Sequence, residues 1–148
     1  MTHRLRALIV EDNVMILKQL QELLAEMTDV NVVGTASSAA GACKWCDART
    51  QACDVAILDL FLEGGTGLDV LEHMAGYERP PDRVVLTNYA TPALRDRCIP
   101  LGAAQVFDTS TEIDWLVPWL SQRVPHYPVS APTRRHAHVL GDARVGLC

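Results

Sequence analysis

Short apolar runs that give way to amphipathic segments recur five times along this chain, and this alternation restricts the fold more than any other feature. The apolar runs are short and rich in β-branched residues, as buried strands are, and the segments between them carry apolar residues at helical spacing. The expected strands span residues 6–10, 30–36, 54–60, 83–88 and 104–108. The expected helices span residues 13–27, 37–50, 68–77, 91–102 and 110–124.

Strands that are apolar on both sides, each followed by a helix, are typical of a parallel sheet covered on both faces. Parallel neighbours need long crossover connections, and the crossover helices bury the two faces of the sheet. We therefore predict a doubly wound α/β fold with five parallel strands and five helices. In such folds the functional residues gather beyond the carboxyl ends of the strands.

Polar residues stand at those strand ends. Glu11 and Asp12 follow the first strand, Asp59 ends the apolar run "VAILDL", Thr87 ends the fourth strand, and "DTS" at 108–110 follows the fifth. Any one acid or hydroxyl there could simply cap the next helix. The whole set, however, occupies the positions that one shared site needs, so we interpret it as a single site.

Three carboxylates at one sheet edge repel one another unless a cation lies between them, and oxygen ligands favour a hard divalent ion such as Mg²⁺. Asp59 precedes a glycine-rich loop, "EGGTG", which leaves its carboxylate open to an incoming group. A carboxylate that attacks a phosphoryl group forms an acyl phosphate, and a nearby hydroxyl such as that of Thr87 could donate to a phosphoryl oxygen. The strand ends thus predict Mg²⁺-dependent phosphoryl transfer to Asp59.

The segments "VEDN", "ILDLFLEGGTGLDVL" and "VVLTNYATPALRDRCIPLGA" resemble, in order and spacing, the receiver domain of two-component response regulators over residues 4–123. The resemblance implies a flavodoxin-like fold with strand order 2-1-3-4-5. It implies that Asp59 accepts phosphate from a histidine kinase or a histidine phosphotransfer protein. It also implies that Mg²⁺ is held by Glu11, Asp12, Asp59 and the backbone carbonyl of Phe61, and that Thr87 is the switch hydroxyl.

Two departures from the family pattern concern the switch. The family carries a lysine after the fifth strand, where this chain has Thr109, and its only lysines, Lys18 and Lys44, fall in the first two predicted helices. Many receivers have an aromatic residue where this chain has Val106. Arg95 could supply the missing positive charge, although a surface arginine is more often simply solvated, and we expect the latter. Phosphate-dependent switching should therefore be weakened.

The composition bounds the domain organisation and the partners. We expect a receiver domain over residues 1–123 and a mostly disordered tail over residues 124–148, which contains prolines at 125, 128 and 132. Residues 1–123 carry 10 basic and 17 acidic side chains, a balance of −7, which argues against direct nucleic-acid binding. No apolar run approaches the ~20 residues of a membrane helix. We expect a stand-alone cytoplasmic regulator.

Two functional hypotheses remain open. The chain is either a phosphorylatable receiver that signals by protein binding, or a degenerate receiver that binds partners regardless of phosphate. Either way it is not an enzyme beyond its own phosphorylation and dephosphorylation. A phosphatase of similar fold is less consistent with the sequence. Such enzymes usually have a DxD pattern, whereas Asp59 is followed here by Leu60 and Phe61.

The helical spacing also predicts a surface for a partner or a second copy. At 100° per residue, the apolar stripe of the last helix leaves Trp115 and Trp119 on the opposite, outward side. The alternative is that Pro118 kinks the helix and turns one ring into a crevice, Trp119 more readily than Trp115. We expect this aromatic pair to anchor a downstream protein or a homodimer on the face made by the fourth helix, the fifth strand and the fifth helix.

Overall fold

In the described part of the chain, five long strands lie parallel in one sheet of order β2-β1-β3-β6-β7. The structure is a computed structural model that describes residues 4–48 and 52–123. Because β6 and β7 are the fourth and fifth strands of this sheet along the chain, the predicted order 2-1-3-4-5 is confirmed. The strands are β1 (Leu5–Val10), β2 (Val30–Ala36), β3 (Val55–Leu58), β6 (Asp82–Thr87) and β7 (Ala103–Asp108).

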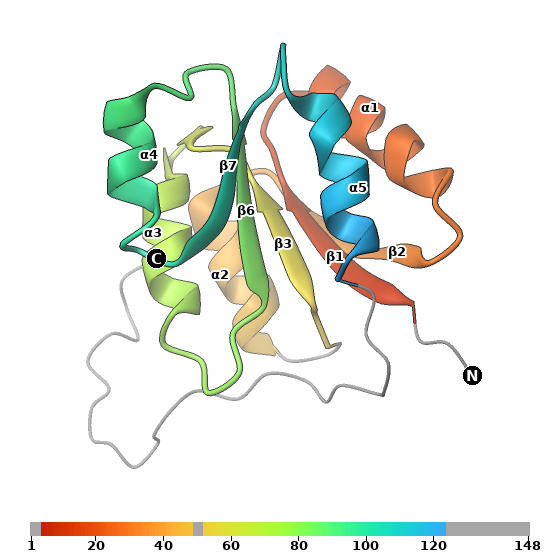
Figure 1. Cartoon of the computed structure of the whole chain (residues 1–148). Coiled ribbons are helices and arrows are strands. Elements are labelled where there is room, and N and C mark those ends of the chain that lie inside the picture. The colour runs from red at the N-terminus through yellow and green to blue at the C-terminus, as the bar shows by residue number, and fades with distance from the viewer. Residues whose placement is uncertain (1–3, 49–51, 124–148) are drawn as a thin grey trace.

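Helices cover both faces of the sheet, as the alternation predicts (Figure 1). The helices α1 (Val14–Ala25) and α5 (Leu116–Ser121) pack on one face, and α2 (Ala39–Ala48), α3 (Gly67–Met74) and α4 (Pro92–Cys98) pack on the other. Side chains of a strand alternate between these two cores. In β1, for example, Ile9 packs beneath α1 and α5, whereas Leu8 and Val10 pack beneath α2, α3 and α4.

Three helices begin at polar residues whose side-chain oxygens accept backbone hydrogen bonds. Asn13 accepts from the N–H groups of Met15 and Ile16 at the start of α1. Thr66 and Asp69 form a capping box at the start of α3. Thr91 accepts from Leu94 at the start of α4, with Pro92 at the first helical position, as predicted. These caps fix where the loops after β1 and β6 end, and both loops border the candidate site.

A two-stranded hairpin that the apolar pattern does not reveal follows β3. Its strands are β4 (Phe61–Leu62) and β5 (Gly65–Thr66), which pair antiparallel. Gly64 makes the turn with φ of 76°, a left-handed conformation that glycine adopts without strain. The glycine-rich loop after Asp59 is thus an ordered structure.

The last helix differs from the sequence prediction. A 3₁₀ turn (η1, Ile113–Trp115) precedes α5, so residues 110–124 do not form one continuous helix. Trp115 is 63% exposed, as predicted, but Trp119 is only 9% exposed, and the prediction for Trp119 is wrong. Within α5 alone, Trp119 is three residues after Leu116 and adjacent to Leu120, both fully buried, so its ring lies on the flank of the buried stripe.

Two sequence expectations meet different outcomes here. None of the helices in the described part of the chain is long and apolar enough to cross a membrane. The expected disordered tail, residues 124–148, lies outside the described residues.

Candidate functional site

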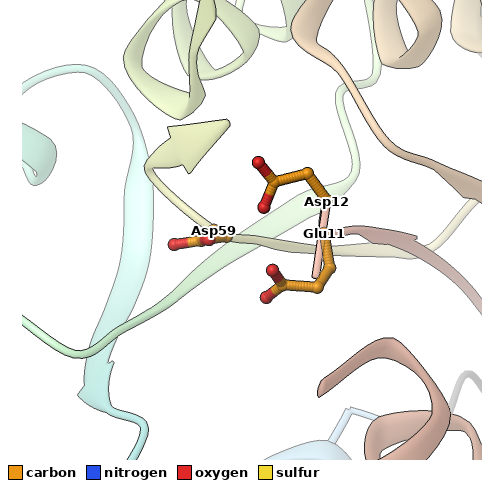
Figure 2. Close-up of side chains that lie close together, drawn as sticks. All are labelled: Glu11, Asp12 and Asp59. Carbon is orange, nitrogen blue, oxygen red and sulfur yellow. The ribbon is translucent and has the colours of Figure 1, made fainter. Parts of the chain in front are cut away.

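The acids predicted from the strand ends do meet at one edge of the sheet. Glu11 and Asp12 follow β1, and Asp59 follows the neighbouring strand β3. One carboxylate oxygen of each residue lies within 4.8 Å of the others (Figure 2). Glu11 is buried at 5% exposure, whereas Asp12 and Asp59 are partly exposed. The cluster therefore has one carboxylate inside the protein and two that solvent can reach.

Burial and mutual repulsion hold protons on this cluster. Burial is the largest cause that raises the pKa of Glu11, from 4.5 to about 7, and the charges of Asp59 and Asp12 raise it further. The Asn13 N–H, which donates to a Glu11 carboxylate oxygen at 3.0 Å, opposes this rise. Burial also raises the pKa of Asp59. Of the two neighbouring carboxyls the proton is favoured on Glu11, because Asp59 raises the pKa of Glu11 whereas Glu11 lowers that of Asp59.

Crowded, partly desolvated carboxylates whose pKa values are raised suit a divalent cation. A cation between them removes the repulsion, and carboxylate oxygens are the ligands that Mg²⁺ prefers. Among the described residues, no other group of three or more acidic, histidine or cysteine side chains is close enough to share an ion. The donor set of this edge therefore fits Mg²⁺.

Local backbone contacts hold Asp59 in the cluster. Its N–H donates to the Val10 carbonyl at 2.9 Å, which ties it to the end of β1. One of its carboxylate oxygens accepts from the Phe61 N–H at 3.3 Å. A Cβ atom on Gly67 would lie 2.4 Å from the Asp59 carbonyl oxygen, so only glycine lets α3 begin this close. The contribution of the Phe61 carbonyl to a metal site stays a prediction.

Thr87 lies at the same sheet edge. Leu58 pairs with Val85 across β3 and β6, so Asp59 and Thr87 follow on neighbouring strands. The Thr87 side chain is buried, and its hydroxyl oxygen accepts from the Tyr89 N–H at 3.3 Å. The hydroxyl proton remains available to donate toward the site.

Thr109 lies beside Thr87, directly after β7. Its N–H donates to the Thr87 carbonyl at 2.9 Å, which fixes the register of the loop after β7. Both lysines of the chain are exposed on helices, Lys18 on α1 and Lys44 on α2. Neither lysine follows β7, and the assignment of Thr109 to the family's lysine position stays a prediction.

Arg95 is not simply solvated, contrary to the expectation from sequence. Its Nε donates to the Ala90 carbonyl at 3.2 Å, one terminal nitrogen donates to the Val106 carbonyl, and the other donates to Glu112 at 2.9 Å. These acceptors lie 5, 11 and 17 positions from Arg95 in the sequence and on three different segments, which a single-sequence pattern does not reveal. The guanidinium is held between α4 and β7.

Asp108, the other acid at this edge, faces its own loop. Its carboxylate accepts from the Ser110 N–H at 2.9 Å, the Ser110 hydroxyl at 2.7 Å and the Thr111 N–H at 3.2 Å. These hydrogen bonds, led by that of the Ser110 side chain, lower the pKa of Asp108. Asp108 thus shapes the loop after β7 and does not join the acid cluster.

Two features near the site escape sequence reasoning. The rings of Phe61 and Tyr89 meet edge to face with centroids 5.2 Å apart, although both side chains are more than half exposed. Glu112 accepts from Arg95 and also from the Asp108 N–H at 2.8 Å. Neither carries a sequence signal, because an isolated aromatic or acid in a loop predicts only a surface position.

Comparisons with known proteins agree with this geometry. The family described as the response regulator receiver domain matches residues 7–117. The acid tolerance regulatory protein ActR of Rhizobium meliloti is 31% identical over 138 residues, which cover 89% of this chain and 69% of ActR. The response regulator UvrY of Escherichia coli is 29% identical over 100 residues, which cover 68% of this chain but only 45% of UvrY.

A solved structure supports the same relationship. The signal receiver domain of a response regulator called NarL from Mycobacterium tuberculosis superimposes with a TM-score of 0.71 at 26% identity. The superposition covers 81% of this chain and 98% of that domain. The likeness thus extends over the whole of a receiver domain.

Proposed function

The chain belongs to the response regulator receiver family, and we propose that its Asp59 accepts a phosphoryl group from a histidine kinase or a histidine phosphotransfer protein. The observation that carries this proposal is the acid cluster, in which Asp59 is the member that follows β3 and borders the buried Thr87 strand end. A retained cluster of this kind costs folding free energy through repulsion, so it is best understood as a working site.

The proposed transfer moves one phosphoryl group between two side chains. An Asp59 carboxylate oxygen attacks phosphorus, the P–N bond to the donor histidine breaks, and an acyl phosphate forms on Asp59. The Thr87 hydroxyl donates to a phosphoryl oxygen. Hydrolysis later returns the Asp59 carboxylate and releases inorganic phosphate. Beyond these two reactions on itself, we propose that the domain is a signalling module and not an enzyme.

Magnesium binding is part of the proposal. Glu11, Asp12 and Asp59 would hold the ion, together with the Phe61 backbone carbonyl. When bound, Mg²⁺ supplies positive charge that offsets the charge of the phosphoryl oxygens. The proton shared by Glu11 and Asp59 must leave for the ion to bind, since metal ligands must be deprotonated.

We propose that this domain signals through protein contacts in the cytoplasm. The acidic balance of residues 1–123 disfavours direct nucleic-acid binding by this part of the chain. The face made by α4, β7 and α5 presents Trp115, which is 63% exposed and suits a downstream protein or a second copy. Trp115→Ala should weaken that association, whereas unchanged self-association and partner binding would remove this surface from the proposal.

A second function is favoured by one specific observation. Thr109 lies beside Thr87, at the position that the family resemblance assigns to a lysine, and threonine supplies no charge to pair with phosphoryl oxygens. The domain could therefore bind partners with little regard to phosphate, as a degenerate receiver. The two functions differ in whether Asp59 takes up phosphate and whether uptake changes binding.

Intact-mass analysis with a small phosphodonor and Mg²⁺ separates the two functions. We expect the wild type to gain one phosphoryl group and Asp59→Asn to gain none. Asp108→Asn is the matched control, because Asp108 lies at the same sheet edge but faces its own loop, and it should still gain one group. No gain by the wild type under forcing conditions would favour the degenerate receiver.

A further inference from the structure

Arg95 joins three segments that meet beside the candidate site. Its planar guanidinium reaches Ala90 in the loop after β6, Val106 on β7 and Glu112 beyond β7. An exposed ion pair on its own contributes little to stability. Here, however, two of the three acceptors are backbone carbonyls, so the contacts fix main-chain positions as well as a side chain.

Glu112 is itself fixed to the end of β7. The carboxylate oxygen that accepts from Arg95 also accepts from the Asp108 N–H at 2.8 Å, and the Glu112 N–H donates to the Asp108 carbonyl at 2.8 Å. The Asp108 N–H and then Arg95 lower the pKa of Glu112, so the carboxylate is ionised at neutral pH. The Arg95–Glu112 pair is thus anchored at both ends.

The same loop carries the proposed switch hydroxyl. Ala90 lies three residues after Thr87, and the Tyr89 N–H between them donates to the Thr87 hydroxyl oxygen. On its other side, Thr87 accepts from the Thr109 N–H. The segment from Thr87 to Ala90 is therefore held to β7 and its following loop without any phosphoryl group.

We propose that Arg95 and Glu112 set the position of the Thr87 loop, residues 88–91 after β6, in the unphosphorylated chain. We call these two residues, together with their hydrogen bonds to Ala90, Val106 and Asp108, the brace. Arg95 is in this sense a positioning residue. The consequence of the brace for signalling rests on the proposed function. A loop whose position is already fixed should move less when Asp59 is phosphorylated. A charged side chain at residue 109 is then not needed to hold the loop, whereas the Thr109 N–H still contacts Thr87.

The brace makes a prediction for hydrogen exchange of the metal-free, unphosphorylated protein. Arg95→Ala should lower the exchange protection of residues 88–91 and the first turn of α4 by about tenfold, because the hydrogen bonds of Arg95 to the loop, to β7 and to Glu112 are lost. Amides of β1 and β3 should keep their protection. Arg97→Ala is the matched control, because Arg97 is an exposed arginine on the same helix outside the brace, and it should change the same amides by less than about twofold.

Substitutions of Glu112 distinguish a brace from a general loss of packing. Glu112→Gln keeps an acceptor for Arg95 and for the Asp108 N–H, so it should retain more protection than Glu112→Ala. Equal exchange in Arg95→Ala and Arg97→Ala would overturn the proposal. A uniform fall in protection that includes β1 and β3 would also overturn it, since that result indicates global destabilisation.

The experiment is independent of the proposed function, because it uses no phosphodonor. A protein that never gains phosphate on Asp59 would disprove phosphorylation and still show the brace. A second experiment tests the brace together with the proposed function. On addition of Mg²⁺ and beryllofluoride, the amide NMR signals of Tyr89 and Ala90 should shift at least about twice as far in Arg95→Ala as in the wild type. Equal shifts would show that the brace does not limit the response of the loop.

Discussion

The two halves of the sheet's carboxyl edge differ in what they retain. The half formed by β1 and β3 carries all three clustered carboxylates, and their oxygens lie within 4.8 Å of one another. The half formed by β6 and β7 carries Thr87 and the uncharged Thr109, and the Arg95 side chain joins its loops. The comparison suggests that accepting a phosphoryl group and transmitting its presence are separable properties of one fold.

The largest expected effect is on Mg²⁺ affinity, which should depend on the acids after β1 and β3 and not on the acid after β7. Asp12→Ala should weaken Mg²⁺ binding by a hundredfold or more, because it removes a ligand and its full negative charge. Removal of a residue that only hydrogen bonds to a metal ligand already weakens metal affinity by roughly 10–100-fold. Asp108→Ala, at the same edge but outside the cluster, should change Mg²⁺ affinity by less than about twofold. Titration calorimetry measures both.

The same variant also probes repulsion within the cluster. Without Mg²⁺, Asp12→Ala should melt at or above the wild-type temperature, because one of three crowded charges is gone. A clear fall in melting temperature would mean that Asp12 stabilises the fold by some other contact and would break the distinction between the halves.

A smaller effect follows from the protonation of Glu11. The pKa of Glu11 is about 7 in the folded chain, above its ordinary value of 4.5, so the folded state binds the extra proton between these pH values. As far as this group is concerned, the stabilisation of the metal-free protein is fully present below pH 4.5 and is lost as the pH rises from 4.5 through about 7. The melting temperature should fall by several degrees over this range.

Two controls sharpen that prediction. Glu11→Gln cannot titrate and should flatten the fall in melting temperature between pH 5 and 8. Saturating Mg²⁺ should also flatten it, because the ion stabilises the ionised cluster. A slope that is the same in Glu11→Gln and in the wild type would assign the pH dependence to other groups.

The smallest expected effect lies in the transmitting half. Thr109→Ala should change the free energy of unfolding by less than about 0.5 kcal/mol, because the Thr109 contact to Thr87 is made by the backbone N–H, which alanine retains. Chemical denaturation measures this change. A loss above about 1.5 kcal/mol would indicate that the threonine side chain has a structural role of its own.

Particular residues show which features of the fold and the site can be predicted from the sequence. The alternation of apolar runs and helical segments predicts the parallel sheet, because such strands must be covered on both faces. Glu11, Asp12 and Asp59 could be placed together, since the ends of parallel strands share one edge. Thr91 and Pro92 could likewise be predicted as a helix start, because a cap depends only on local residues.

The remaining features depend on contacts that are distant in the sequence or on a change of local geometry. The direction of the Arg95 side chain is set by Val106 and Glu112, 11 and 17 residues away. The sequence offers the burial of Trp119 only as an alternative to an outward ring, because the 3₁₀ turn before α5 ends the single helical period that the pattern assumes. Composition and periodicity contain neither kind of information.

The separation of the two halves is tested most directly by beryllofluoride-induced NMR shifts of Thr87 and residues 88–91 in wild type and Thr109→Lys, both saturated with Mg²⁺ and the analogue. The added lysine restores a charge-assisted hydrogen bond that contributes on the order of 1.5 to 3 kcal/mol. We predict that the analogue binds Asp59 in both proteins and that the loop shifts are small in the wild type and clearly larger in Thr109→Lys. Equal shifts in the two proteins would contradict the claim that residue 109 separates phosphate uptake from switching.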